Sequence, residues 1–575
     1  MPVQNAEIAR IFEQVADLLE IQQANRFRVR AYRTAAQTVR GLPRALHELV
    51  ARGEDLSRLP GIGEDLAGKI AEIVRTGKLR QLAEIGHQVP RGLAELLAVP
   101  GIGPQRVRRL HEELGIRSRA GLLRAARQHR VRTLPGFGAR TEQAILDALA
   151  AQPAGAAKRT LWSEAEPVAR QLVADLRRLP GVEAVEVAGS FRRRRETVGD
   201  LDLLVASRHG ATVVAHFVGH EDVARVLARG TTKASVRLRS GLQVDLRVVE
   251  RAAYGAALVY FTGSKAHTIA LRRLAVQRRL KLNEYGAFRG ARRVAGRTER
   301  DVYRSVGLHF VEPELRENRG EIELARKRAL PRLVQLGDLR GDLHAHTDAS
   351  DGADGLQAMA AAAKKLGHEY LAITDHTRAA RIAHGLDVRA MRRHLARIER
   401  LDRQLRGIRI LRSAEVDILA DGSLDLPDDL LAELDLVVAA VHSDFRKSRS
   451  AQTERILRAM DHPRLHVLAH PSGRLLGERE GLAVDLERIV AGAAERGCCL
   501  ELNCQPTRLD LPDVWLQAAK EAGVKIAIST DAHSTAQLAL LAAGVGYARR
   551  GWLQAEDVLN TRSWADIARL LRRGS

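Results

Sequence analysis

The stretch GSFRRRRETVGDLDLL at residues 189–204 is the most informative part of this 575-residue chain. Asp200 and Asp202 are two residues apart within an apolar run, so on a β-strand both carboxylates face the same side. Burying two like charges is costly unless cations neutralise them, and oxygen ligands suit Mg²⁺. A third carboxylate, Asp245, lies in the apolar stretch QVDLR at residues 243–247. The pattern predicts phosphoryl transfer assisted by two magnesium ions.

The beginning of the same stretch supports this interpretation. Gly189 and Ser190 form a tight turn whose amide and hydroxyl groups can hold a triphosphate, and Arg193 adds positive charge. An Asp-x-Asp pair alone is more often part of a half-exposed strand. With the turn eleven residues upstream and Asp245 available, nucleotidyl transfer is the favoured interpretation.

Charge and composition restrict the remaining possibilities. Of the formal net charge of +22, residues 1–300 contribute all, with 52 Lys and Arg against 30 Asp and Glu, whereas residues 301–575 hold 40 of each. A basic half suits a polyanion, although solvated helix faces can have the same composition. There is no apolar run of about 18–20 residues, no secretory signal and too few cysteines for a disulfide framework. We therefore expect a cytoplasmic protein with no membrane partner.

A short motif recurs three times in the helical first 150 residues, as LPGIG at 59–63, VPGIG at 99–103 and LPGFG at 134–138. One such motif is more often an ordinary turn. Three in a basic region predict hairpins whose helix amides grip the DNA backbone without reading bases. The glycines expected at these contacts are Gly61, Gly63, Gly101, Gly103, Gly136 and Gly138.

From residue 341 onward, short apolar strands alternate with helices, which predicts a parallel α/β sheet or barrel. Histidines and carboxylates follow most of these strands, where barrel active sites lie. Imidazole and carboxylate without thiolate favour Mn²⁺, Zn²⁺ or Fe²⁺, and nine such side chains suit about three ions. The nine are His344, His346, Asp351, His376, Glu415, His442, His470, Asp531 and His533.

These patterns predict a multidomain chain. We expect helical DNA-binding domains at 1–85 and 86–150, an α/β domain that carries the three carboxylates at 160–255 and a further subdomain at 256–320. A linker at 321–340 would then precede a barrel-like metal-dependent domain at 341–575.

Taken together, the motifs resemble a bacterial-type family X DNA polymerase with a C-terminal polymerase and histidinol phosphatase (PHP) domain. The resemblance covers nearly the whole chain. It implies that 160–255 is an α/β nucleotidyltransferase palm and that 256–320 is a nucleotide-closing subdomain. It implies that Asp200, Asp202 and Asp245 are the catalytic metal ligands and that the nine C-terminal residues are the PHP ligands. The residues that it places at the incoming nucleotide are Gly189, Ser190, Arg193, Gly199, Tyr260, Phe261, Gly263, Lys265 and Arg272.

The N-terminus resembles the domain with which that family binds gapped DNA. The stretch FRVRAYRTAA at 27–36 places Tyr32 and Arg33 at DNA. Lys69 falls where some relatives have a Schiff-base lysine that removes 5′-deoxyribose phosphate, but Asp65 replaces a basic phosphate contact of those relatives.

The sequence therefore predicts a monomeric polymerase that fills short gaps in DNA repair, using dNTPs on gapped or primer-template DNA. The second site would use Mn²⁺ or Zn²⁺ for 3′→5′ exonuclease activity or related end processing. Two alternatives remain. One is a template-independent nucleotidyltransferase fused to a metabolite phosphatase, and the other is a binding scaffold with degenerate sites.

Overall fold

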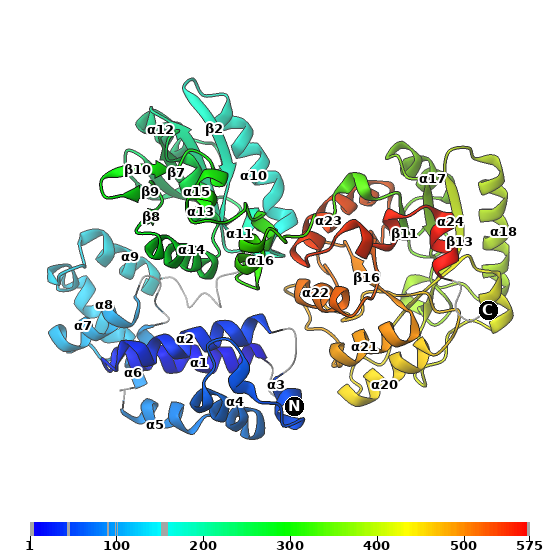
Figure 1. The fold of residues 1–575 in the computed structure, drawn as a ribbon, viewed down its shortest axis with the longest axis horizontal. Helices are drawn as coiled ribbons and strands as arrows, with labels where there is room; N and C mark the ends of the chain where they lie inside the picture. The colour runs from blue at the N-terminus through cyan, green and yellow to red at the C-terminus, as the bar shows by residue number, and fades with distance from the viewer. Residues whose placement is uncertain are drawn as a thin grey trace. The chain divides into compact units, whose positions relative to one another are not determined.

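The computed structural model describes residues 5–42, 46–88, 91–97, 99, 102–150 and 159–571. The chain divides into two compact units, Met1–Lys158 and Arg159–Ser575, and each is described by itself (Figure 1). Within the described ranges, no helix combines the length and the apolar character needed to cross a membrane.

The first unit is helical. Its helices are α1 (Asn5–Ile21), α2 (Arg26–Gly41), α3 (Leu46–Ala51), α4 (Glu64–Thr76), α5 (Arg80–Gln88), α6 (Arg91–Leu96), α7 (Pro104–Leu114), α8 (Arg119–Arg127) and α9 (Ala139–Ala150), with 3₁₀ turns at Leu56–Arg58 and Val131–Thr133. The segments 1–85 and 86–150, expected as two domains, share one hydrophobic core that extends from Ile8 to Ile145. Helix α1 contacts both α5 and α7, which joins the two halves.

The region 160–255, expected to form the palm, contains a five-stranded sheet in the order β2-β4-β7-β6-β5. Its strands are β2 (Val182–Val187), β4 (Asp200–Ser207), β5 (Val223–Arg229), β6 (Lys233–Leu238) and β7 (Gln243–Val249). Strands β4 and β7 pair in parallel, and the other neighbours in this sheet are antiparallel. A small ribbon of β1 (Thr160–Leu161) and β3 (Thr197–Val198) precedes β4 in the chain.

The two faces of β4 follow the alternation of its sequence. Leu201, Leu203 and Val205 pack with α10 (Trp162–Arg177) and α12 (Gly210–Val218) in one core. Leu204 and Ala206 point the other way and pack with α13 (Tyr254–Thr262). Because Asp200 and Asp202 share the phase of Leu204, both carboxylates lie on the α13 side.

The next subdomain continues from α13. It contains α14 (Lys265–Gln277), β8 (Lys281–Asn283), β9 (Gly286–Arg289), β10 (Arg292–Ala295), α15 (Glu299–Ser305), a 3₁₀ turn (Pro313–Leu315) and α16 (Glu321–Lys327). Helix α16 lies in the stretch 321–340 that the sequence suggests is a linker, yet Ile322 and Ala325 are buried in this subdomain's core. The exposed side of α16 carries the charged residues Glu323, Arg326 and Lys327, and this composition resembles that of a linker.

The C-terminal domain is built on seven parallel strands in sequential order. They are β11 (Gly341–Ala345), β12 (Tyr370–Ile373), β13 (Arg409–Asp417), β14 (Leu436–Ala440), β15 (Val467–Leu468), β16 (Cys499–Asn503) and β17 (Ile526–Ser529). A parallel bridge from Ala345 to Ala532 and a hydrogen bond from Thr530 to Asp342 join the last strand to the first. The sheet is therefore a nearly closed barrel.

Helices surround this barrel (Figure 1). They are α17 (Leu356–Lys365), α18 (Val388–Gln404), α19 (Asp428–Glu433), α20 (Arg449–Met460), α21 (Leu486–Arg496), α22 (Asp513–Glu521), α23 (Leu541–Arg550) and α24 (Trp564–Leu570). Parallel strands place their carboxyl ends at one edge, so the loops after them meet there.

Candidate active sites

The three palm carboxylates come together on adjacent strands. Asp202 on β4 and Asp245 on β7 are direct register partners, and Asp200 is two residues before Asp202 on the same face. Gly189, at the start of the short helix α11 (Gly189–Arg192), has φ of +65°, and a Cβ there would overlap the Asp202 carboxylate. Only glycine allows the turn to approach the carboxylates this closely.

The electrostatics of this trio match a cation site. Burial, with the negative charges of Asp200 and Asp245, raises the pKa of Asp202 to about 7. Burial and Asp245 also raise the pKa of Asp200. Carboxylates that repel one another in this way are the donor set that Mg²⁺ prefers, so the residues fit divalent ions.

Two of the expected phosphate contacts flank the carboxylates. Ser190 lies in α11, and Gly199 directly precedes β4. Arg193, at the end of α11, donates from Nε to Glu317 (3.0 Å) and from Nη1 to the carbonyl of Thr262. The Arg193 guanidinium is thus held in place by neighbouring segments, which the sequence does not reveal.

The expected nucleotide contacts beyond the palm fall on α13 and α14. The rings of Tyr260 and Phe261 meet edge to face at 5.1 Å, and the Arg247 guanidinium lies 4.7 Å from the Phe261 ring. Gly263 follows α13 and lies beside Arg193. Lys265 and Arg272 are on α14, seven residues apart and so on similar sides of the helix.

The nine C-terminal side chains converge at the carboxyl ends of the barrel strands. Among the described residues, three groups bring ligand atoms within 4.8 Å of one another. The groups are His346, Asp351, His376 and His533; His344, His346 and Asp531; and His376, Glu415 and His442. His470 adjoins the third group, with Nε2 at 2.9 Å from Oε1 of Glu415.

Carboxylates and imidazoles lie next to one another in this cluster, and they shift each other's pKa values in opposite directions. Burial alone would lower the pKa of His344, but Glu501, Glu415 and Asp531 raise it well above its ordinary value. Burial would raise the pKa of Glu415, but His376 and His442 hold it well below its ordinary value. Mixed nitrogen and oxygen donors, packed this closely, fit a cluster of transition-metal ions.

A second layer of polar residues orients these ligands. Glu501 on β16 accepts from Nδ1 of His344 (2.7 Å), and Asn503 donates to Asp531 (2.9 Å). Oδ1 of Asp417 lies 3.3 Å from Nδ1 of His442. Such partners fix the ring orientation and the tautomer of ligating histidines.

Sequence reasoning missed Glu501, Asn503 and Asp417. A signal for them was present, since each is a polar residue in a buried part of its strand, and Glu501 and Asn503 alternate on one face of β16.

The hairpins of the first unit have the expected backbone geometry where they are described. Gly61 and Gly136 have φ of +76° and +83°, and Gly63 and Gly103 are the N-caps of α4 and α7. Gly138 directly precedes α9. Gly101 lies outside the described residues.

Tyr32 and Arg33, expected at DNA, are engaged within the protein. Tyr32 is 1% exposed and meets Phe12 edge to face at 5.5 Å. Arg33 pairs with Asp17 (2.8 Å) and Glu20 (2.7 Å). The stretch at 27–36 therefore uses these two residues for packing and for ion pairs on α1.

Models of known protein families match the chain in the order of the predicted domains. Residues 3–79 match a helix-hairpin-helix domain, 93–151 a SAM-like helix-hairpin-helix tandem, 257–317 the DNA polymerase beta thumb and 342–504 the PHP domain. These matches confirm the predicted fold class of helical hairpin domains followed by a polymerase region and a PHP barrel.

One relative aligns over the full length. The chain is 36% identical over 571 residues to the DNA polymerase/3'-5' exonuclease PolX of Bacillus subtilis (strain 168), covering 99% of both proteins. The C-terminal part is 28% identical over 217 residues to a probable phosphatase of Thermoanaerobacter sp. (strain X514), covering 34% of this chain and 86% of that protein. A probable phosphatase of Acetivibrio thermocellus is 31% identical over 201 residues, with coverage of 33% and 78%.

Proposed function

The chain belongs to the bacterial-type family X DNA polymerases with a C-terminal PHP domain, and on this basis we propose that it fills short gaps in DNA and trims DNA 3′ ends at a second site. The observation that carries the proposal is the pairing of Asp202 with Asp245 beside Asp200 and the close Gly189-Ser190 turn. A full-length relative named as a polymerase and exonuclease supports it over a template-independent enzyme fused to a metabolite phosphatase.

In the palm, Asp200, Asp202 and Asp245 would hold Mg²⁺, which supplies charge neutralisation for in-line displacement at the α-phosphate. The backbone and hydroxyl of Ser190 and the guanidinium of Arg193 would orient the triphosphate of a dNTP. Tyr260 and Phe261 would contact its sugar and base, while Lys265 and Arg272 would offer positive charge near the nascent pair.

At the barrel edge, the nine ligands would hold about three Mn²⁺ or Zn²⁺ ions, which activate water for attack on a phosphodiester. Glu501 holds the Nδ1 side of His344, so that its Nε2 faces the cluster. Asp351 and His533 lie toward the open side of the site, with side chains 26% and 32% exposed. This is where a DNA 3′ end would enter.

The hairpins would bind the DNA backbone without regard to base sequence. Amides at the starts of α4, α7 and α9 would meet DNA phosphates, as at other helix N-termini. We expect a monomer that acts in the cytoplasm on gapped or primer-template DNA during repair.

A time course on one-nucleotide-gapped, end-labelled DNA tests this function. With dNTPs and Mg²⁺ the primer should grow by one templated nucleotide, and with Mn²⁺ alone it should shorten from its 3′ end. Extension that ignores the template base would favour the template-independent alternative. Release of inorganic phosphate without shortening would instead favour a phosphatase at the second site, as the smaller relatives are named.

A further inference from the structure

Arg192, Arg193 and Arg194 follow the expected phosphate-binding turn, and their guanidinium groups contact other residues of the protein. Arg192 forms a two-pronged ion pair with Glu299 (2.7 and 2.8 Å), and Arg193 pairs with Glu317 (3.0 Å). The Arg194 guanidinium stacks 4.2 Å from the ring of Trp162. Buried guanidinium groups are stable only with such partners, so these contacts fix the conformation of the turn.

The C-terminal domain reaches this turn through Arg550, the last residue of α23. Its side chain is 1% exposed and donates to the main-chain carbonyl of Arg193 (2.5 Å) and to Glu317 (3.0 Å). Arg550 therefore contacts the backbone of Arg193 directly and holds the carboxylate that orients the Arg193 side chain. Burial would raise the pKa of Glu317, but Arg550 and Arg193 lower it to about 2.

Arg550 is itself oriented from within the C-terminal domain. Asp513, at the start of α22, accepts from its Nη2 (2.8 Å) and also pairs with Arg319 (3.0 Å). A guanidinium with three fixed partners has little freedom, because its planar fork matches them simultaneously.

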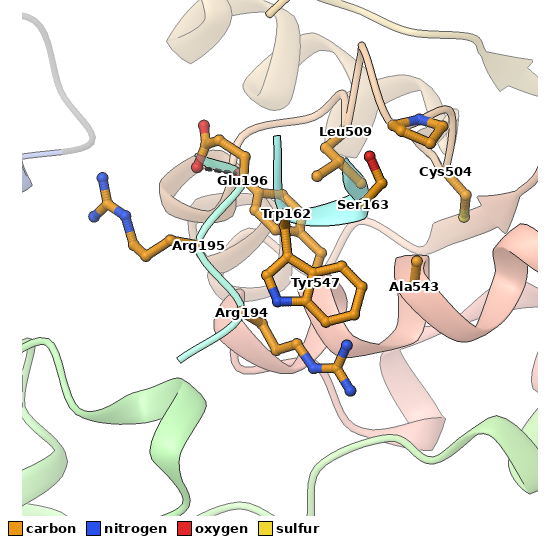
Figure 2. A pocket seen from close by; sticks show the side chains of 10 residues that line it. Trp162, Ser163, Arg194, Arg195, Glu196, Cys504, Leu509, Ala543 and Tyr547 are labelled. Carbon is orange, nitrogen blue, oxygen red and sulfur yellow. Dashed lines mark hydrogen bonds between the residues drawn. The ribbon is translucent and has the colours of Figure 1, made fainter. Parts of the chain in front are cut away.

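A second contact from the C-terminal domain holds the same segment at Glu196, three residues after Arg193. Arg474 donates to Glu196 (3.1 Å), and the Tyr547 hydroxyl donates to it as well (3.4 Å). Figure 2 shows Glu196 and Tyr547 near Trp162 and Arg194 in a small pocket that residues of the palm and the barrel domain line together. Arg474 also donates to the carbonyl of Arg508, so it is anchored on its own side. The segment 193–196 is thus held at both ends from the barrel domain.

We propose that Arg550 is a positioning residue for the polymerase reaction, through which the barrel domain sets the geometry of the triphosphate-binding turn. The inference rests on the proposed function, since it takes Arg193 as a triphosphate contact. Its consequence is that dNTP binding at the palm depends on a residue of the other catalytic domain, whereas DNA binding and 3′-end trimming do not.

The test is steady-state extension by the full chain carrying Arg550→Lys. A lysine keeps the charge, but one ammonium cannot span the Arg193 carbonyl, Glu317 and Asp513 together. We expect the KM for dNTP to rise about tenfold, with a smaller change in kcat, an unchanged Kd for primer-template DNA and unchanged Mn²⁺-dependent trimming. Arg549→Lys is the matched control, because Arg549 pairs with Glu314 (2.7 Å) and lies next to Arg550 on α23.

A wild-type KM for dNTP in Arg550→Lys would overturn the inference, as would an equal rise in Arg549→Lys. If Arg550→Lys does not fold, as judged by Tm and by loss of trimming, Glu317→Gln tests the same linkage from the subdomain that follows the palm and must raise the KM for dNTP. Failure of the wild-type chain to extend a primer would instead refute the proposed function, so the two failures are distinguishable.

Discussion

Both candidate active sites are suited to binding cations, but they differ in the charges of their side chains. The palm brings three carboxylates together, and burial, with the negative charges of the other two, raises the pKa of Asp202 to about 7. The barrel site mixes imidazoles with carboxylates, so that His442 and Glu415 stabilise each other's charged forms. The palm therefore depends on added cations for its charge balance, whereas the barrel site is balanced by its own protons.

This difference has a chemical consequence. Ions entering the palm replace little more than one proton, but ions entering the barrel must displace protons from several histidines.

Separating the two sites should give the largest effect. Asp200→Ala with Asp202→Ala should reduce primer extension by at least about 10³-fold, because the ligands of both ions are lost, while trimming in Mn²⁺ continues. His344→Ala with His346→Ala should do the reverse. End-labelled primers resolved by length measure both activities, and loss of both from either folded double variant would refute two independent sites.

The two sites should also differ in the number of protons that they release when a metal ion binds. Burial would lower the pKa of His442 and of His533, but the carboxylates Glu415 and Asp351, respectively, raise these values to about 10 and about 9. At pH 8 the ion-free barrel therefore holds protons on both, whereas Asp202 in the palm has already lost its own.

Titration calorimetry at pH 8 in two buffers of different ionisation enthalpy measures this release. With the palm double variant, metal binding should release at least about two protons, and affinity should rise with pH up to about 10. With the barrel double variant, release should be close to zero at about pH 8 and approach one at about pH 6. Equal release at both sites would contradict the charge contrast.

The strands that carry the ligands could be predicted because their sequences are simple. The alternation around Asp200 and Asp202 and the apolar runs before His376, His442 and His470 correspond to β4, β12, β14 and β15. Each of these strands is largely buried, so side-chain pattern and burial agree.

Other features depend on distant partners and leave no local pattern. The run 192–195 looks like a basic patch, but Arg192 and Arg193 pair with Glu299 and Glu317, more than 100 residues away. Arg33, predicted to contact DNA, likewise pairs with Asp17 and Glu20 of α1, while its side chain stays 43% exposed. Tertiary structure is needed to distinguish a basic side chain for DNA from one for an internal ion pair.

A hairpin glycine should give a moderate effect. In Gly61→Ala the new Cβ would sit at φ of +76° and 2.6 Å from Cγ2 of Thr34. The left-handed conformation alone costs about 1–2 kcal/mol. We expect about tenfold weaker binding of gapped DNA by fluorescence anisotropy. Gly53→Ala is the control, since its φ is +69° and no described atom lies within 4 Å of the Cβ. Equal weakening by both variants would mean that general destabilisation, not the hairpin, is measured.

The smallest effect is expected at Lys69, where the structure opposes the chemistry that the family resemblance suggests. A Schiff base requires a free amine, so a catalytic lysine needs a lowered pKa. Burial lowers the pKa of Lys69, but Asp65 at 2.5 Å and Tyr32 outweigh this and raise it. The Lys69 ammonium also lies 5.2 Å from the centre of the Tyr32 ring, which further favours the charged form.

We therefore expect weak or absent removal of 5′-deoxyribose phosphate, with binding of a 5′-phosphate intact. Borohydride trapping on a 5′-deoxyribose-phosphate substrate measures the covalent intermediate. Asp65→Asn should increase trapping above the wild-type level, because it removes the anion that stabilises the ammonium. Lys69→Ala should leave binding of 5′-phosphorylated gapped DNA within about twofold of wild type, since a single ion pair near the surface contributes little. Strong capture by the wild-type chain that disappears in Lys69→Ala would show that the amine is reactive despite Asp65.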